Sequence, residues 1–348
     1  MELKIKNRLI KPGNATYIIA ELSANHNQDF DKAVKLIEVA KEIGADAVKL
    51  QTYTADTITI NCGNEYFRIN QGTLWDGRTL YDLYSEAQTP WDWQPKLKAI
   101  AEGVGIDLFS SPFDATAVDF LEKMHVPAYK IASFEIVDLP LIKRVAQTGK
   151  PIIISTGMAT LAEIEEAITV IRKTGNNQIA LLKCTSAYPA SPEEMNLNTI
   201  SHLSKTFSVP AGISDHTLGI EVPLAAVALG ACIVEKHFTL SRSYPGPDSH
   251  FSLEPHEFKK LIEGIRIVEK AVGEVSYGIT EKQKASRLFR RSLFAVEDIK
   301  EGQLFTSKNI RSIRPGNGLH TRYLEVVLGK KARINIDRGT PLSWDLIG

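Results

Sequence analysis

Short, largely apolar runs recur along the first two thirds of the chain, and nearly every one ends in polar residues. There are eight runs, at residues 17–22, 47–52, 106–111, 128–133, 151–156, 179–184, 210–215 and 232–237. The stretches between them, such as residues 30–43 and 161–173, carry apolar side chains at helical spacing. Strand and helix therefore alternate eight times, which predicts an α/β fold, the (β/α)8 TIM barrel. Because the carboxyl ends of barrel strands share one face, we expect the polar residues at those ends to converge.

The pattern changes in three other parts of the chain. We expect the barrel domain to occupy residues 1–272, opening with a short strand or hairpin, and residues 273–290 to form a polar linker. Residues 291–348 carry short strand-like runs separated by glycines, which predicts a small β-rich domain. Inside the barrel, residues 53–89 form an unusually long connection with the aromatic residues Tyr66, Phe67, Trp75, Tyr81 and Tyr84. We expect this connection to form a wall facing the substrate.

Composition and charge narrow the range of functions. Lys+Arg and Asp+Glu balance at 41 each, which argues against nucleic acid or an anionic membrane as a partner. No apolar run is long enough to span a bilayer, and the first residues resemble a strand rather than a signal peptide. The cysteines Cys62, Cys184 and Cys232 show no CxxC spacing, and two of them lie in expected strands, so we expect a reducing cytoplasm.

Two histidines follow the last two expected strands, His216 in SDHT and His237 in EKHF. Neighbouring strand ends can bring two imidazoles to one divalent cation and leave positions open for water or a carbonyl oxygen. Either histidine alone would suit a hydrogen-bonded loop position better, but their matching positions favour metal ligation. Without a firm third ligand, the pair predicts a weak, exchangeable site for Mn²⁺, Mg²⁺ or Co²⁺.

Three lysines, Lys49, Lys130 and Lys183, lie at the ends of alternate strands. Hydroxyl residues accompany them: Ser110, Ser111, Ser133, Ser155, Thr156 and Ser214. Ammonium groups beside hydroxyls favour a cradle for phosphate or carboxylate. One such lysine would equally suit an ion pair with Glu21 or Glu235, but three unbalanced charges facing the lumen would require an anion. A Schiff-base lysine is a competing interpretation, which needs only one of the three.

Four further polar residues end strands or lie in the loops that follow. Glu21, in AELSANH, is either a general base toward a bound water or the counter-ion of a lysine, and both roles stay open. Gln51, Tyr188 and Asp248 are candidates to bind the hydroxyls of a sugar, and a structural role is as well supported for each.

A series of ordered motifs covers essentially the whole chain: AELSANHN, GADAVKLQTY, SSPFD, YKIAS, STGMA, KCTSAYP, GISDHTLG, EKHFT and IRPGNGLH. In these motifs the chain resembles the sialic acid synthase family, which condenses phosphoenolpyruvate with an amino-sugar aldehyde. The C-terminal domain resembles the antifreeze-like (SAF) module of that family. Residues 72–93, with KCTSAYP and VKLQTY, are most similar to the pseudaminic acid branch, and Ser186 stands where the sialic acid branch has Asn. The resemblance implies 2,4-diacetamido-2,4,6-trideoxy-L-altrose as the sugar substrate.

The resemblance also implies a role for each matching residue. Contacts to phosphoenolpyruvate are implied for Lys49, Ser110, Lys130, Ser133, Ser155, Ser186 and Ser214. The metal ligands would be His216 and His237, the catalytic carboxylate Glu21, and the sugar contacts Gln51, Tyr188 and Asp248. Arg314, in IRPGNG, matches an arginine that the small domain of one protomer inserts into its partner's barrel, so a domain-swapped homodimer is implied.

Three rival interpretations stay open at this point. The chain could make N-acetylneuraminic or legionaminic acid from a different amino sugar. It could be an aldolase that forms a lysine Schiff base with pyruvate, which borohydride would trap. It could also be a non-catalytic glycan-binding protein, although this would leave the polar residues at the barrel mouth unexplained.

Overall fold

The computed structural model describes residues 2–70 and 72–348. The chain divides into two compact units, the first ending at Gly273 and the second spanning Glu274–Gly348. Each unit buries an apolar core of its own.

Eight parallel strands close into a barrel in the first unit, which confirms the fold predicted from the apolar runs. They are β3 (Tyr17–Glu21), β4 (Ala47–Thr52), β5 (Asp107–Pro112), β6 (Tyr129–Ile131), β7 (Ile152–Ser155), β8 (Ile179–Cys184), β9 (Ala211–Asp215) and β10 (Ile233–His237). Strand β10 closes the ring by pairing with β3. Sequential strands are neighbours, so strands four positions apart, such as β6 and β10, face each other across the lumen.

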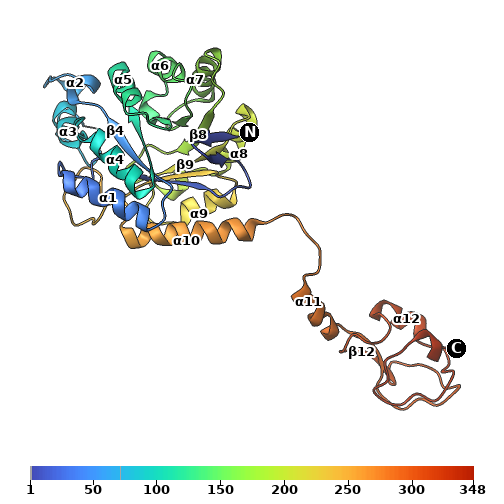
Figure 1. Ribbon diagram of the computed structural model, residues 1–348. Helices are drawn as coiled ribbons and strands as arrows, with labels where there is room; N and C mark the ends of the chain where they lie inside the picture. The colour runs from blue at the N-terminus through green and yellow to red at the C-terminus, as the bar shows by residue number, and fades with distance from the viewer. Residues whose placement is uncertain (1, 71) are drawn as a thin grey trace. The chain divides into compact units, whose positions relative to one another are not determined.

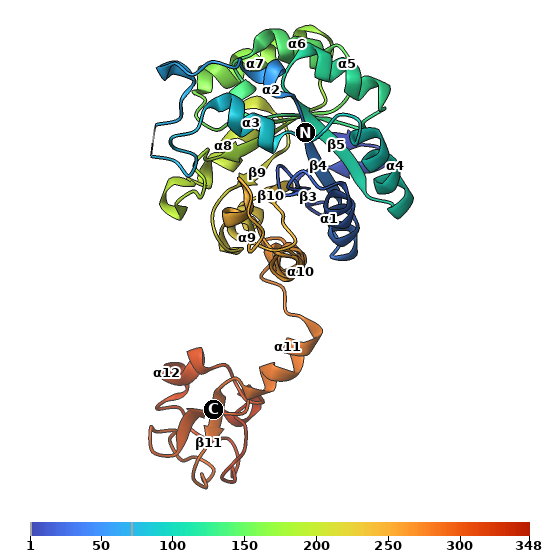
Figure 2. The same ribbon diagram turned by 90° about the vertical axis from the view of Figure 1, so that its left-hand side faces the viewer.

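Helices surround the strands on the outside of the barrel (Figures 1 and 2). They are α1 (Phe30–Glu42), α4 (Gln94–Val104), α5 (Ala115–Lys123), α6 (Leu139–Ala146), α7 (Leu161–Lys173), α8 (Asn198–Phe207), α9 (Glu221–Ala228) and α10 (Pro255–Val272). Helix α1 shows why these segments are helical. Asp29 caps its first turn by accepting a hydrogen bond from the Lys32 N–H, and one face buries Ala33, Leu36, Ile37 and Ala40.

Two segments of the first unit lie outside this repeat. Strands β1 (Leu3–Ile5) and β2 (Arg8–Ile10) form an antiparallel hairpin whose apolar residues join the core of the barrel unit. The long connection from β4 to α4 includes the helices α2 (Ala55–Ile58) and α3 (Leu80–Ala87) and a short 3-10 helix, Glu65–Phe67.

The second unit contains a short helix and a small β-rich body. Part of the segment expected to be a linker is helical, namely α11 (Glu281–Ser286). A capping box of Thr280 and Gln283 stabilises the start of this helix. Strands β11 (Ser292–Ala295) and β12 (Ile310–Ile313) pair antiparallel, and α12 (Leu324–Val327) follows. Residues 332–336, in the domain where short strand-like runs were expected, make isolated bridges, Ala332 with Ile347 and Ile336 with Ile299.

Within the two described stretches of the chain, none of the helices combines the length and the apolar character needed to cross a bilayer.

Candidate active site

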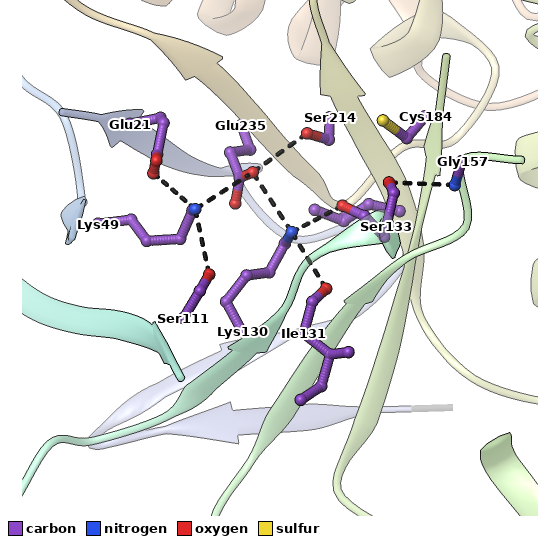
Figure 3. A network of polar contacts seen from close by, with 12 residues as sticks. Glu21, Lys49, Ser111, Lys130, Ile131, Ser133, Gly157, Cys184, Ser214 and Glu235 are labelled. Atoms are coloured by element: carbon purple, nitrogen blue, oxygen red, sulfur yellow. Dashed lines mark hydrogen bonds and ion pairs between the residues drawn. The ribbon is translucent and has the colours of Figure 1, made fainter. Parts of the chain in front are cut away.

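Four charged side chains meet inside the barrel, and we call them the ionic cluster: Glu21, Lys49, Lys130 and Glu235 (Figure 3). The Lys49 Nζ lies 2.6 Å from Glu21 Oε2 and 3.9 Å from Glu235 Oε1. The Lys130 Nζ lies 3.4 Å from the same Glu235 oxygen. Because Lys130 is on β6 and Glu235 on the opposite strand β10, this pair spans the lumen. All four side chains are almost completely buried.

The two carboxylates of the ionic cluster differ in acidity. Burial alone would raise the pKa of Glu235, but Lys130 and Lys49 outweigh it and hold this pKa below its ordinary value. Burial raises the pKa of Glu21 to about 6, although Lys49 opposes the shift. Carboxyl groups whose environments separate their pKa values in this way can take different acid–base roles. Glu235 is therefore suited to remain ionised and Glu21 to exchange a proton near neutral pH.

The structure corrects the prediction that three unbalanced lysines share the lumen. Cys184 is the register partner of Ser214, which faces Glu235, so the preceding residue of β8, Lys183, lies on the other face of that strand. Its Nζ donates to the Cys184 carbonyl at 2.7 Å and to Thr185 Oγ1 at 3.0 Å. Lysines from two strands, not three, therefore converge, and two carboxylates balance them.

Hydroxyl groups line the ionic cluster, as expected for most of the predicted serines. The Lys130 Nζ donates to Ser155 Oγ at 2.7 Å, the Lys49 Nζ to Ser111 Oγ at 3.3 Å, and Ser214 Oγ to Glu235 Oε1 at 3.1 Å. The structure places Ser110 away from this cluster. Its Oγ lies 2.6 Å from Thr52 Oγ1, which bonds to Gln94 of the outer helix α4. An offset of one residue along a strand reverses the face, so Ser111 is the better candidate to contact an anion.

A second small cradle lies where Ser133 and Ser186 approach Gly157. The Gly157 N–H donates to Ser133 Oγ at 3.2 Å. A Cβ atom added at Gly157 would lie 2.2 Å from Ser186 Oγ and 2.7 Å from Ser133 Oγ. Loops from three strand ends thus pack closely at Gly157, and a methyl group at this position would overlap both hydroxyls. Both predicted serines are brought together here, and Gly157 is a member that sequence reasoning did not single out.

The predicted sugar contacts form a hydrogen-bonded chain that reaches the ionic cluster. The Gln51 Nε2 donates to Glu21 Oε1 at 2.9 Å and to Ser23 Oγ at 3.0 Å, and Ser23 Oγ donates to Asp248. Asp248 and Gln51 are only partly buried, so both can face a ligand. Tyr188 lies instead beside His216, with the two ring centroids 4.3 Å apart.

The two predicted metal ligands lie side by side, with ring centroids 5.3 Å apart. The His216 Nδ1 lies 3.0 Å from the Thr185 carbonyl oxygen. Because a carbonyl oxygen only accepts, this contact assigns the proton to Nδ1 and leaves the lone pair of Nε2 available to a metal. The His237 Nδ1 is buried without a hydrogen-bond partner. Residues 2–70 and 72–348 contain no cluster of three or more His, Cys, Asp or Glu side chains that could hold a metal. The donors present fit a divalent cation held by two imidazoles, with its remaining positions left to water and substrate.

A buried ion pair fixes the backbone around both histidines. The Lys236 Nζ donates to Asp215 Oδ2 and, at 2.6 Å, to the Thr217 carbonyl oxygen. Asp215 Oδ1 accepts hydrogen bonds from the Thr217 N–H at 3.0 Å and the Thr217 Oγ1 at 2.9 Å. His216 stands between two residues of this network, and His237 directly follows its lysine.

Glu135 is a candidate that sequence reasoning missed. It ends a short 3-10 helix, Ser133–Glu135, immediately after β6, and its Oε2 is buried without a hydrogen-bond partner. Burial raises its pKa to about 7, although its own backbone, Lys130 and Lys49 act in the opposite direction. The signal in the sequence was an acidic residue two positions beyond Ser133, at a strand end already identified.

Arg314 belongs to the second unit, where its side chain is exposed at the end of β12. Its contact with a barrel therefore stays a prediction.

Comparison with known proteins identifies the family of the chain. Residues 36–277 match the model of the NeuB family, and residues 290–348 match that of the SAF domain. The chain belongs to the NeuB family. The resemblance to sialic acid synthases, recognised in the sequence motifs, is thereby confirmed.

Named NeuB relatives cover nearly the full length. The pseudaminic acid synthase of Helicobacter pylori is 46% identical, over 94% of this chain and 96% of its own. The N,N'-diacetyllegionaminic acid synthase of Campylobacter jejuni is 41% identical, over 92% and 96%. Among solved structures, the N-acetylneuraminic acid synthetase of Leptospira borgpetersenii superposes with a TM-score of 0.73 at 32% identity, covering 82% of this chain and 95% of that one.

Proposed function

We propose that this chain condenses phosphoenolpyruvate with 2,4-diacetamido-2,4,6-trideoxy-L-altrose and water, giving pseudaminic acid and phosphate. The observation that carries the proposal is the placement of two buried lysines and their hydroxyl neighbours beside a pair of facing histidines. Such a site offers ammonium and hydroxyl donors to a small anion and, next to them, a place for a carbonyl group. Sequence identity of 46% to a pseudaminic acid synthase, against 41% to a legionaminic acid synthase, supports the choice of sugar.

Phosphoenolpyruvate has a carboxylate and a phosphate, and the barrel has donors for both. Lys49 and Lys130 would bind it together with Ser111 and Ser155, which already accept hydrogen bonds from the two ammonium groups. The cradle of Ser133, Gly157 and Ser186 would hold a second part of the same molecule. Holding the vinyl carbon next to the aldehyde replaces an encounter in solution by one fixed geometry.

Glu21 is the residue suited to handle the proton. With a pKa of about 6, it can accept a proton from water as that water adds to the enol carbon of phosphoenolpyruvate. The vinyl carbon meanwhile bonds to the aldehyde carbon, whose oxygen takes up a proton and becomes a hydroxyl group. The tetrahedral centre formed by water then collapses to a ketone: its C–O bond to the phosphate breaks, and phosphate leaves with the bridging oxygen and the proton of the new hydroxyl group. A divalent cation, Mn²⁺, Mg²⁺ or Co²⁺, held by His216 and His237 would supply Lewis-acid polarisation of the aldehyde oxygen.

The proposal is tested by assaying candidate amino sugars side by side, with phosphate release as the readout and bridging ¹⁸O in phosphoenolpyruvate. We expect turnover of 2,4-diacetamido-2,4,6-trideoxy-L-altrose to exceed that of N-acetylmannosamine and of the legionaminic acid precursor. The ¹⁸O label should appear in phosphate. Preference for another sugar would contradict the choice of substrate. Label retained in the sugar acid would contradict cleavage of the C–O bond, and full activity after exhaustive chelation would contradict the metal.

We further propose that the enzyme is a cytoplasmic, domain-swapped homodimer in which Arg314 completes the partner's site. An exposed arginine at the end of β12 supports this role, because it is free to reach another surface. Mixing Arg314→Ala chains with Glu21→Ala chains should restore some activity, since heterodimers would contain one intact site. No recovery with heterodimers confirmed by native mass spectrometry would mean that Arg314 does not act across the dimer.

A further inference from the structure

The long connection after β4 crosses the mouth of the barrel. It leaves β4, yet the ring of Trp75 lies 5.8 Å from that of Tyr188, which follows β8. Strands β4 and β8 are four positions apart and therefore opposite each other in the closed barrel. The Trp75 Nε1 also donates to the Pro247 carbonyl oxygen at 3.3 Å, in the loop after β10. Trp75 is thus fixed to the loop after β8, across the mouth, and to the loop after β10.

Local hydrogen bonds hold Trp75 in this position. Arg68 and Thr79 form an antiparallel bridge, and the Ile69 N–H donates to the Arg78 carbonyl oxygen at 3.0 Å. The carboxylate of Asp76, next to Trp75, accepts hydrogen bonds from the N–H groups of Gly72 and Thr73 at 2.8 and 2.9 Å. Trp75 is therefore held by a locally hydrogen-bonded structure.

Aromatic rings lead from Trp75 to the two histidines. The ring of Tyr188 lies between Trp75 and His216, and the ring of Phe251 lies 5.3 Å from Tyr188 and 4.9 Å from His237. We call Trp75, Tyr188 and Phe251 the aromatic wall. Of the five aromatic residues expected in this connection, Trp75 makes the contact across the mouth, while Tyr66 is 81% exposed.

We propose that Trp75 and the aromatic wall select an amino sugar that ends in a methyl group over one that ends in a hydroxymethyl group. This inference rests on the proposed function, in which the sugar aldehyde lies at the histidine pair. Trp75 stands one ring further out, so it would meet the end of the sugar remote from the aldehyde.

The chemistry of the wall explains the preference. The indole N–H of Trp75 is already bonded to Pro247, and Phe251 has no polar atom. A hydroxyl group against the rings of Trp75 and Phe251 would lose hydrogen bonds to water without gaining new ones, whereas a methyl group there gains apolar burial. A wall of this kind discriminates by about 10–200-fold, since apolar pockets reject a small added group only modestly.

Trp91 provides a matched control in the same connection. It is partly buried like Trp75, and its Nε1 donates to the Tyr53 carbonyl oxygen at 3.1 Å. Its ring, however, packs on Phe120 of the outer helix α5, with centroids 4.7 Å apart. Substituting Trp91 therefore removes the same side chain and the same type of hydrogen bond without changing the wall.

The experiment measures binding by calorimetry and kcat/KM for the 6-deoxy sugar and its 6-hydroxy counterpart, on wild type, Trp75→Ala, Trp75→Phe and Trp91→Ala. We expect wild type and Trp91→Ala to prefer the deoxy sugar by about 10–200-fold, Trp75→Ala to lose most of this preference, and Trp75→Phe to keep much of it. Equal preference in wild type and Trp75→Ala, or no preference in wild type, would overturn the inference. Preferential binding of the deoxy sugar without turnover would refute the proposed reaction and leave the wall supported.

Discussion

The ionic cluster and the aromatic wall occupy the same barrel mouth but are built differently. The ionic cluster comes from the strands β3, β4, β6 and β10, is almost completely buried and neutralises its own charges. The aromatic wall comes from connections beyond β4, β8 and β10, and Trp75 and Tyr188 are only partly buried. Rigid strands thus carry groups that need fixed charge geometry, while loops carry those that determine shape. The two regions should consequently serve different substrates.

Removing a charge from the ionic cluster should have the largest effect. In Lys130→Met, Glu235 loses its cationic partner at 3.4 Å and keeps Lys49 at 3.9 Å and Ser214, while Ser155 loses its donor. We expect phosphoenolpyruvate affinity, measured by calorimetry, to fall by about 30-fold or more, since truncating a buried charge partner costs about 2–5 kcal/mol.

The control is Lys150→Met, which removes a lysine paired at 2.6 Å with Glu122 in a more exposed setting. That change should cost about 0–1 kcal/mol of stability and leave binding intact. Equal losses of phosphoenolpyruvate binding in both variants would mean that Lys130 acts only through stability.

The next largest effect concerns metal affinity, through the ion pair that supports the histidines. The double variant Asp215→Leu with Lys236→Met replaces both charges by apolar groups, which is often neutral for stability. Asp215 and Thr217 flank His216, and the double variant loses the hydrogen bonds that Asp215 and Lys236 make with Thr217. We therefore expect Mn²⁺ affinity to fall by about 10–100-fold. Electron paramagnetic resonance of free Mn²⁺ measures the affinity and thermal melting the stability. Unchanged affinity in a folded double variant would contradict the positioning role.

The parts of the site that followed from sequence are those set by strand ends. The spacing of the apolar runs placed Glu21, Lys49, His216 and His237 at the carboxyl end of the barrel, because all strands of a closed parallel barrel end on the same side. Side-chain direction on a strand could not be fixed so well. Ser110 was expected where Ser111 lies, because adjacent serines have opposite faces and the sequence does not set the register.

Interactions between distant segments were also beyond reach of the sequence. The sequence offered Glu235 as a partner for a lysine, but it did not say that Lys130 reaches it across the lumen, and nothing in it brings Trp75 to Tyr188. Both contacts depend on the closure of the ring. The convergence of Gly157 with two serines likewise comes from three separate loops.

A smaller effect is expected on stability from Glu135, which borders the ionic cluster. Burial raises its folded pKa to about 7 from an ordinary value of 4.5, so the folded state retains a proton that the unfolded state releases earlier. Stability contributed by this group is present below pH 4.5 and is lost as pH rises toward 7. Glu135→Gln should therefore stabilise the protein at pH 8 relative to pH 4.5, by about 2 kcal/mol after allowance for partial exposure. A pH-independent difference between the denaturation midpoints of variant and wild type would contradict the raised pKa.

The division of the mouth between two substrates is tested most directly by a two-substrate kinetic matrix on Gly157→Ala, Trp75→Ala and their combination. A methyl group at Gly157 would press on Ser133 and Ser186, and overpacking of this kind costs about 1–3 kcal/mol. We predict that Gly157→Ala raises the KM for phosphoenolpyruvate by about tenfold or more and leaves that for the sugar unchanged. Trp75→Ala should raise the KM for the sugar and leave that for phosphoenolpyruvate unchanged. The two effects should add in the combined variant. If each variant raised both KM values alike, the account of two separate binding regions would be wrong.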